Sequence, residues 1–151
     1  MKSLKIIHAV ILLIIFIPLQ IFPQDINVHY AIGKKQSDVI KQFGKPVHQD
    51  NSNPAMVCMF YKGQNYNLIF VSDQEGVYQS EANVNYAQEN TARAEIDKFI
   101  SKSLTNEFTV DTVSAVDFRL QKKGVKVELQ LLENRLSNRF EIRVKANRSE
   151  G

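Results

Sequence analysis

Two stretches near the C-terminus alternate strictly between apolar and polar residues. The apolar positions are Val125, Val127, Leu129 and Leu131 in the first stretch, and Phe140, Ile142, Val144 and Ala146 in the second. Because successive side chains of a strand point to opposite faces, this period of two predicts adjoining strands with one buried face and one wet face. A sheet with a covered side and a solvated side is therefore the strongest constraint on the fold.

The rest of the chain predicts short helices and more strands of the same kind. A helix over 35–43 ends at Gly44 with Pro46 beyond it, and an apolar stripe predicts a second helix after residue 90. The stripe consists of Ala92, Ile96, Phe99, Ile100 and Leu104. The predicted strands are 56–61, 66–71 and 77–86 after the first helix, and 113–120, 125–132 and 135–145 after the second.

This order predicts an α+β fold. We expect two tandem units, each a helix plus a three-stranded antiparallel meander, with the helices packed on one face of the sheet. The first unit spans 25–86 and the second 87–151, within a single domain of 25–151. The turn at 62–65 and the turn at 121–124 would be equivalent points of the two units.

The hairpin of the first unit is apolar on both sides. Pairing across the turn places Tyr61 opposite Tyr66 and Met59 opposite Leu68, with Cys58, Phe60 and other apolar residues behind them. One interpretation is that both sides are covered internally, by the second unit or by residues 25–31. The other is that the tyrosine side stays exposed and binds a partner. The binding residues would then be Met59, Tyr61, Tyr66, Leu68, Tyr78 and Tyr86.

The first 24 residues are typical of an export signal. Lys2 and Lys5 precede an apolar core over 9–17, and Pro18 follows. The core is shorter than the roughly 20 residues that span a bilayer. We expect cleavage near Gln24 and an exported protein, periplasmic or secreted. An uncleaved leader would be the only membrane contact.

Charge and cysteine content give little sign of a special partner. The chain has 19 basic and 16 acidic residues, and loss of Lys2 and Lys5 leaves 17 against 16, a net charge of +1. This balance, together with export, argues against nucleic acid as a partner. The single cysteine, Cys58, lies between Val57 and Met59 and is expected to be a small buried residue.

The segment IGKKQSDVIKQFGKP, followed by a meander, resembles the small envelope lipoproteins of the SmpA/OmlA type. Gly33, Val39, Gly44 and Pro46 match that pattern over about 50 residues of the first unit. The resemblance implies a β-lactamase-inhibitor-protein-like fold and non-catalytic protein binding in the envelope. Lys35 stands where the family has Ser or Thr, and no cysteine follows the leader, which argues against a lipid anchor.

Residues for catalysis or metal binding are few. His48 and Asp50 are residue types that could act as an acid–base pair, but no nucleophile can be assigned to them from the sequence. Asp25 and His29 could bind a metal together with His48 and Asp50, but these four residues do not have the sequence spacing of a known metal site. We therefore expect no enzyme activity, no metal and no cofactor.

The predicted function is an exported protein-binding module for another envelope or exported protein, as an assembly accessory or an enzyme inhibitor. The alternatives are a small-ligand or peptide carrier, and an enzyme using His48 and Asp50.

Overall fold

The structure is a computed structural model that describes residues 25–150, so the predicted leader lies outside the described residues. The elements follow in the order η1 (Val28–Ala31), α1 (Gln36–Phe43), β1 (His48–Asp50), β2 (Val57–Lys62), β3 (Tyr66–Asp73), β4 (Gly76–Tyr86), α2 (Glu89–Thr105), β5 (Thr109–Ser114), β6 (Asp117–Lys122), β7 (Val125–Asn134) and β8 (Arg139–Arg148). No helix in this part of the chain is long and apolar enough to cross a membrane.

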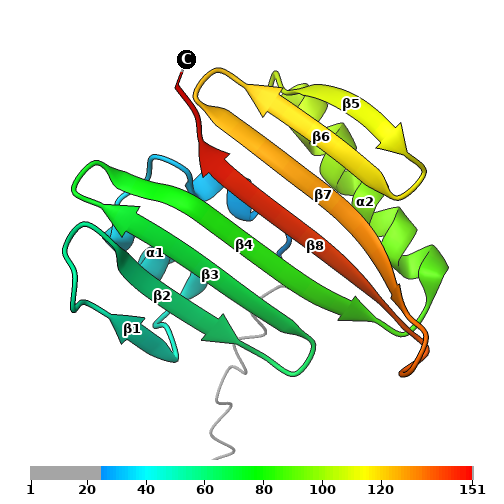
Figure 1. Cartoon of the computed structure of the whole chain (residues 1–151), viewed down its shortest axis with the longest axis horizontal. Coiled ribbons are helices and arrows are strands. Elements are labelled where there is room, and N and C mark those ends of the chain that lie inside the picture. Colours follow the sequence, from blue (N-terminus) through cyan, green and yellow to red (C-terminus); the bar gives the residue numbers. More distant parts are fainter. Residues whose placement is uncertain (1–24, 151) are drawn as a thin grey trace, which may run out of the picture.

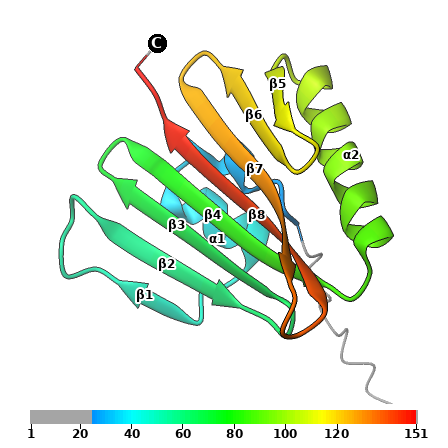
Figure 2. The ribbon, with the colours of Figure 1, turned by 45° about the vertical axis from the view of Figure 1, so that its right-hand side comes forward.

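All eight strands form one antiparallel sheet in the order β1-β2-β3-β4-β8-β7-β6-β5. Figure 1 shows η1, α1 and α2 on the same side of it, and Figure 2 shows α2 running beside β5 at one edge. The predicted α+β fold of two tandem helix-plus-three-strand units is therefore wrong. The fold is mostly β, because β4 pairs with β8 along the sequence from Gln79 to Tyr86 and joins all strands into a single sheet.

Two strands were missed by the sequence analysis, and both are edge strands. β1 lies in the polar segment that was expected to be a loop, and β5 begins in the expected linker. The predicted strand 113–120 contains a turn, in which Ser114 Oγ accepts a hydrogen bond from Val116 N at 3.2 Å. β1 has only three residues, and the register of β5 shifts between Thr112 and Ser114.

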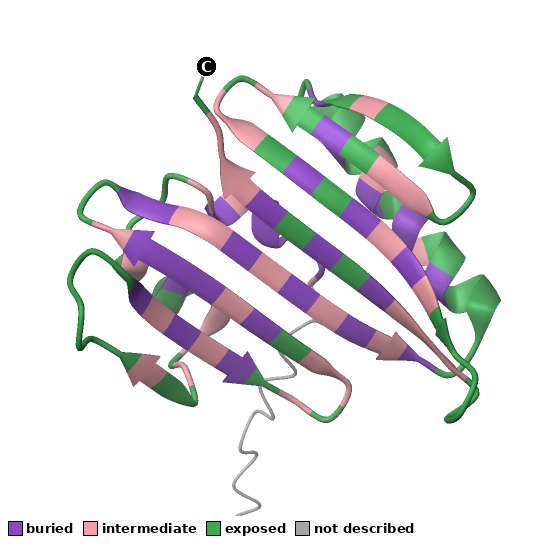
Figure 3. Ribbon diagram, in the orientation of Figure 1, coloured by how far each residue is buried: buried purple, intermediate pink, exposed green. Residues whose placement is uncertain are grey.

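The core lies between the sheet and the helices. Along β2, β7, β8 and most of β4, buried residues alternate with more exposed ones, as the bands in Figure 3 show. The buried side chains of β7 and β8 are those predicted from the alternation, with Leu129, Ile142 and Val144 fully buried. Small residues make room for η1: Ser80 and Ala146 pair across β4 and β8, and Ser80 Oγ donates to Val28 O at 2.9 Å.

The end of α2 has a residue in a conformation that suits glycine. Glu107 has φ 66°, its N–H donates to Leu104 O, and Phe108 N donates to Ser103 O, both at 3.0 Å. This is the pattern of a Schellman helix end, where a left-handed residue other than Gly costs free energy.

We therefore expect Glu107→Gly to raise the free energy of unfolding by about 0.5–1 kcal/mol. The ion pair lost with Lys122 is exposed on the glutamate side and contributes little. Urea titration would measure the change. Asp97→Gly inside α2 is the control, and it should lower stability by about 0.3–0.5 kcal/mol, the difference between the helix propensities of Asp and Gly. A Glu107→Gly variant destabilised as much as this control would contradict the proposed strain.

Candidate binding surface

The side of the sheet that faces away from the helices is not covered by any described element, and we call it the open face. Its middle is one row of side chains that crosses all eight strands through the cross-strand pairs. From β1 to β5 the row is His48, Phe60, Ile69, Glu81, Lys145, Glu128, Arg119 and Asp111. The side chains of the row therefore change in character, from mainly apolar on β2 and β3 to charges of alternating sign from β4 to β5.

The apolar end of the open face consists of Cys58, Phe60, Ile69 and Val71 on β2 and β3. Val71 is 8% exposed and the other three are half-buried. The His48 ring lies 5.6 Å from the Phe60 ring. Partly exposed apolar side chains on an uncovered sheet face are one mark of a protein interaction surface.

The charged end consists of Glu81, Lys145, Glu128, Arg119 and Asp111. The Lys145 ammonium lies 3.7 Å from the Glu81 carboxylate, and both groups are partly exposed. For the other three, no ion pair within 4.0 Å is found among the described residues. These charges therefore remain available to groups on another molecule.

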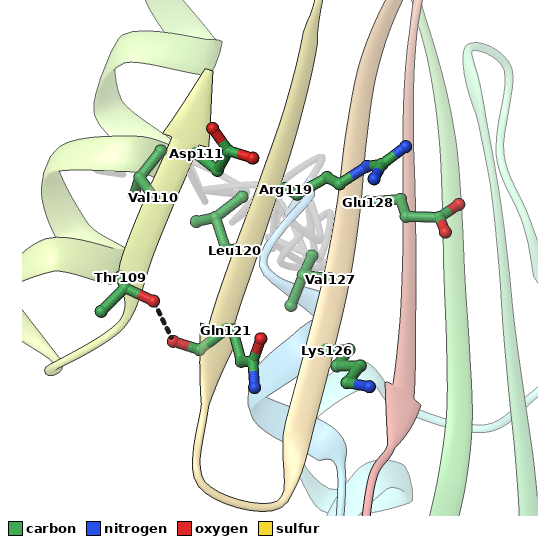
Figure 4. A pocket seen from close by; sticks show the side chains of 9 residues that line it. All are labelled: Thr109, Val110, Asp111, Arg119, Leu120, Gln121, Lys126, Val127 and Glu128. Carbon is green, nitrogen blue, oxygen red and sulfur yellow. Dashed lines mark hydrogen bonds between the residues drawn. The ribbon is translucent and has the colours of Figure 1, made fainter. Parts of the chain in front are cut away.

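The charged end is hollowed in two places. A hollow of about 480 Å³ lies over β5, β6 and β7, and Figure 4 shows the side chains around it. At its rim Thr109 Oγ1 donates to Gln121 O at 3.1 Å. A second hollow of about 410 Å³ lies over β4, β7 and β8 and shares Glu128 with the first. Both are lined mainly by polar and charged side chains.

The second hollow has fixed polar groups at its floor. Arg143 Nε donates to Asn83 Oδ1 at 3.2 Å, and its Nη2 donates to Glu141 Oε1 at 2.9 Å. Gln79 Nε2 donates to Glu81 Oε1 at 2.8 Å. These contacts hold the side chains in defined directions, which reduces the entropy lost when a partner binds.

Five of the six residues predicted to bind lie on the other side of the sheet, and the sixth, Tyr78, lies at the register shift of β4 and lines a hollow with Gln79 and Asn147. Met59, Tyr61, Leu68 and Tyr86 are buried, and Tyr66 and Tyr78 are half-buried. The interpretation that leaves the tyrosine side exposed is not supported, because α1 covers this side at Tyr61, whose Oη donates to Gly44 O at 3.0 Å. A binding role for these six residues stays a prediction.

Two details of the predicted hairpin also differ. Tyr61 pairs with Leu68 and Met59 with Phe70, two residues away from the predicted register. Tyr78 has no partner on β3, because the register of β3 and β4 shifts between Val71 and Ser72. The Tyr78 ring instead lies 5.8 Å from the guanidinium of Arg148.

His48 and Asp50 lie on the open face beside the apolar end, two residues apart on β1. In the described part of the chain no hydrogen bond joins them, and Asp50 Oδ1 accepts instead from Ser52 N at 2.9 Å. That hydrogen bond lowers the pKa of Asp50. Burial, with a smaller effect from Asp50, raises the pKa of the Cys58 thiol, which disfavours the reactive thiolate.

Other candidate ligands do not converge. Within residues 25–150 no group of three or more His, Cys, Asp or Glu side chains is placed to hold a metal ion. His29 is buried in the core, far in the fold from His48 on the opposite face, and Asp25 accepts hydrogen bonds from Asn27.

The sequence contains a signal for the open face that the sequence analysis did not use. Lys62 and Asn67 pair across β2 and β3 and lie on the side of Phe60 and Ile69. Both are exposed. Polar residues also occupy the corresponding positions of β4, namely Gln79, Glu81, Asn83 and Asn85. The same apolar–polar alternation that was used for β8 is therefore present in β4, and applying it there would have identified the wet face correctly.

Comparisons with known proteins give no family. No family model matches the chain, and no curated protein matches it. The resemblance to SmpA/OmlA proteins thus stays a prediction.

Two solved structures are similar to parts of it. A cysteine-rich secretory protein (SAV1118) of Staphylococcus aureus Mu50 has a TM-score of 0.42 at 13% identity, over 76% of this chain and 44% of that one. An extracellular protein containing a SCP domain from Bacillus anthracis Ames has a TM-score of 0.38 at 11% identity, over 84% and 47%. This chain therefore spans less than half the length of either protein, and likeness of this size says nothing of its activity.

Proposed function

We propose that this protein is an exported, non-catalytic module that binds another envelope or exported protein through its open face. The leader sequence supports export. The observation that carries the proposal is the central row, which places a partly exposed apolar end next to an array of alternating charges. Protein interfaces combine these two elements, an apolar anchor and a polar surround that fixes orientation.

The shape of the surface favours a protein over a small molecule. The two hollows are within the size range of ligand pockets, roughly 300–1,000 Å³, but such pockets are mostly apolar inside. Here the lining is mainly polar and charged, and side chains from neighbouring strands of one sheet face form both hollows. A large surface that meets many of these groups at once fits them better than one small ligand.

The charges also bear on the kind of partner. The charged end holds three acidic and two basic groups, so its sum is near neutral. A partner is thus selected by the pattern of its charges and not by their total. Nucleic acid, which presents charges of one sign, is disfavoured by this arrangement.

The test compares two double variants in capture from an extract of the envelope. Arg119→Ala with Lys145→Ala removes both basic groups of the charged end, while Lys41→Ala with Lys98→Ala removes two exposed basic groups from α1 and α2. The two variants have the same net charge. We expect the wild type and the Lys41→Ala, Lys98→Ala variant (the helix-side variant) to retain the same proteins. The Arg119→Ala, Lys145→Ala variant (the sheet-side variant) should lose them, because its affinity for them should be lower by about tenfold or more.

Equal retention by the two variants would contradict the role of the open face. A small molecule bound to the purified protein, seen as a fixed added mass in native mass spectrometry and lost in the Arg119→Ala, Lys145→Ala variant, would support the carrier alternative instead.

A further inference from the structure

The first ten described residues, 25–34, form a strap across the helix side of the sheet. Ile26, Val28 and Ala31 are buried in the core. Gly33 N donates to Val77 O at 2.7 Å, and Val77 N donates to Lys34 O at 2.9 Å. The strap is therefore attached to β4 at its end, and the Ser80–Val28 hydrogen bond attaches it in the middle.

His29 connects the strap to α2. Its side chain is 1% exposed, and its ring centroid lies 4.5 Å from Phe99 on α2 and 5.2 Å from Phe108. His29 Nε2 lies 3.3 Å from Ser103 Oγ, a hydroxyl that is itself fully buried. Within the described residues His29 Nδ1 has no hydrogen-bond partner.

This geometry is suited to the neutral imidazole. A neutral ring has one N–H and one acceptor nitrogen, so the Ser103 hydroxyl can serve Nε2 in either role. A protonated ring carries two N–H donors. In this site one of them would lack an acceptor, and the charge would be enclosed by aromatic rings, which is costly in a low dielectric.

Few charges surround the ring. On the strap itself, Asp25 favours protonation; on α2, Lys102 opposes it. The Tyr30 ring lies beside the His29 ring, with the two ring centroids 3.9 Å apart. The Lys122 ammonium from β6 lies behind Phe108, 5.9 Å from its ring centroid. η1 packs on β4 and β8, whose buried side chains here, Ser80, Ala82 and Ala146 among them, are neutral.

We propose that His29 is an acid-sensitive latch, and that its protonation releases the strap from α2 while the eight-stranded sheet stays folded. The strap is separable because it contributes no strand to the sheet. Strap and sheet are linked by the buried side chains of Ile26, Val28 and Ala31 and by the few hydrogen bonds named above. Release would expose the buried surface of Phe99 and Phe108, together with the part of β4 and β8 beneath η1.

The size of the effect follows from the pKa of His29, which burial lowers from 6.5 to about 4, with Asp25 opposing the shift and Lys102 adding to it. The released ring binds a proton more readily than the docked ring, so docking is strongest above pH 6.5 and weakens as the pH falls toward 4. Between pH 7.5 and pH 4.5 the equilibrium should shift toward release by about 70-fold. Below pH 4 both states are protonated and the loss levels off.

Hydrogen exchange read by mass spectrometry tests this proposal, with rates corrected for the intrinsic effect of pH. In the wild type, protection factors of residues 26–34 should fall by about 70-fold from pH 7.5 to pH 4.5. The protection factors of β7 and β8 should stay well above those of the strap at both pH values, because these strands exchange only when the whole sheet unfolds. His29→Phe keeps a ring of similar size without a titrating group and should remove the drop, while His48→Phe on the open face should leave it unchanged.

Two results would overturn the latch. One is strap protection that does not change with pH, or that equals the protection of β7 and β8 at each pH, which would mean that the strap opens only when the whole protein unfolds. The other is a drop of the same size in His29→Phe. If that variant fails to fold, the His29 ring can be titrated by NMR in the wild type, and a midpoint that differs from the midpoint of strap release would equally exclude the proposal.

Discussion

Replacing Phe70 with alanine is expected to lower the free energy of unfolding by about 3–5 kcal/mol. Phe70 is on β3, is fully buried, and lies 4.9 Å from the Phe43 ring and 5.7 Å from the Tyr61 ring. The substitution removes one of the contacts that join α1 to the sheet and leaves a cavity that neighbouring strands fill only in part. Thermal unfolding should show a Tm lower by roughly 10–20 °C.

The adjacent residue provides a matched control. Ile69 points to the open face and is half-buried, so Ile69→Ala should cost about 1–1.5 kcal/mol. Together the two variants also test which face is covered. Similar losses of stability for Phe70→Ala and Ile69→Ala would contradict the assignment of the Phe70 side of β3 as the side that the helices cover.

Gly76→Ala is expected to destabilise the protein by about 3 kcal/mol. Gly76 has φ +120°, a conformation that side chains disfavour. A Cβ there would lie 2.8 Å from Lys34 O and 2.9 Å from Gly33 O, which are backbone atoms of the strap. The strap would have to shift and would strain or lose its two hydrogen bonds with Val77.

Gly124→Ala isolates the backbone part of this effect. Gly124 also has a positive φ, +82°, but no atom lies within 4 Å of an added Cβ. Its replacement should cost only ~1 kcal/mol. Urea titration of both variants gives the comparison, and equal losses would show that the close approach of the strap to Gly76 is unimportant.

The sequence predicted the local elements better than the way they join. Gly44, with φ +80°, ends α1 as expected, and the alternation of β7 and β8 identified their buried side. The pairing of β4 with β8 is a contact between residues about 60 apart in the chain, and alternation alone contains no information about which strands meet. The single sheet could not be deduced for this reason.

The candidate surface was predicted on the tyrosine side of the hairpin, which the structure buries, because β2 and β3 are apolar on both sides. Tyr61 suggested a wet tip, but its hydroxyl is bonded to Gly44 O within the fold. The exposed pair of Lys62 and Asn67 identifies the open face, and the two-residue difference in register does not change this, because only an odd shift moves side chains to the other face. The row from His48 to Asp111 needs all seven strand pairings and was beyond the reach of one sequence.

The two lateral rims of the sheet have a consequence for self-association. β1 offers only three residues, all polar or charged, and the bulge in β5 interrupts the spacing that an incoming strand would need. Neither rim is a good template for continued strand addition, so the molecule resists growth into fibrils or sideways polymers. Contacts with other molecules are thereby directed to its broad surfaces.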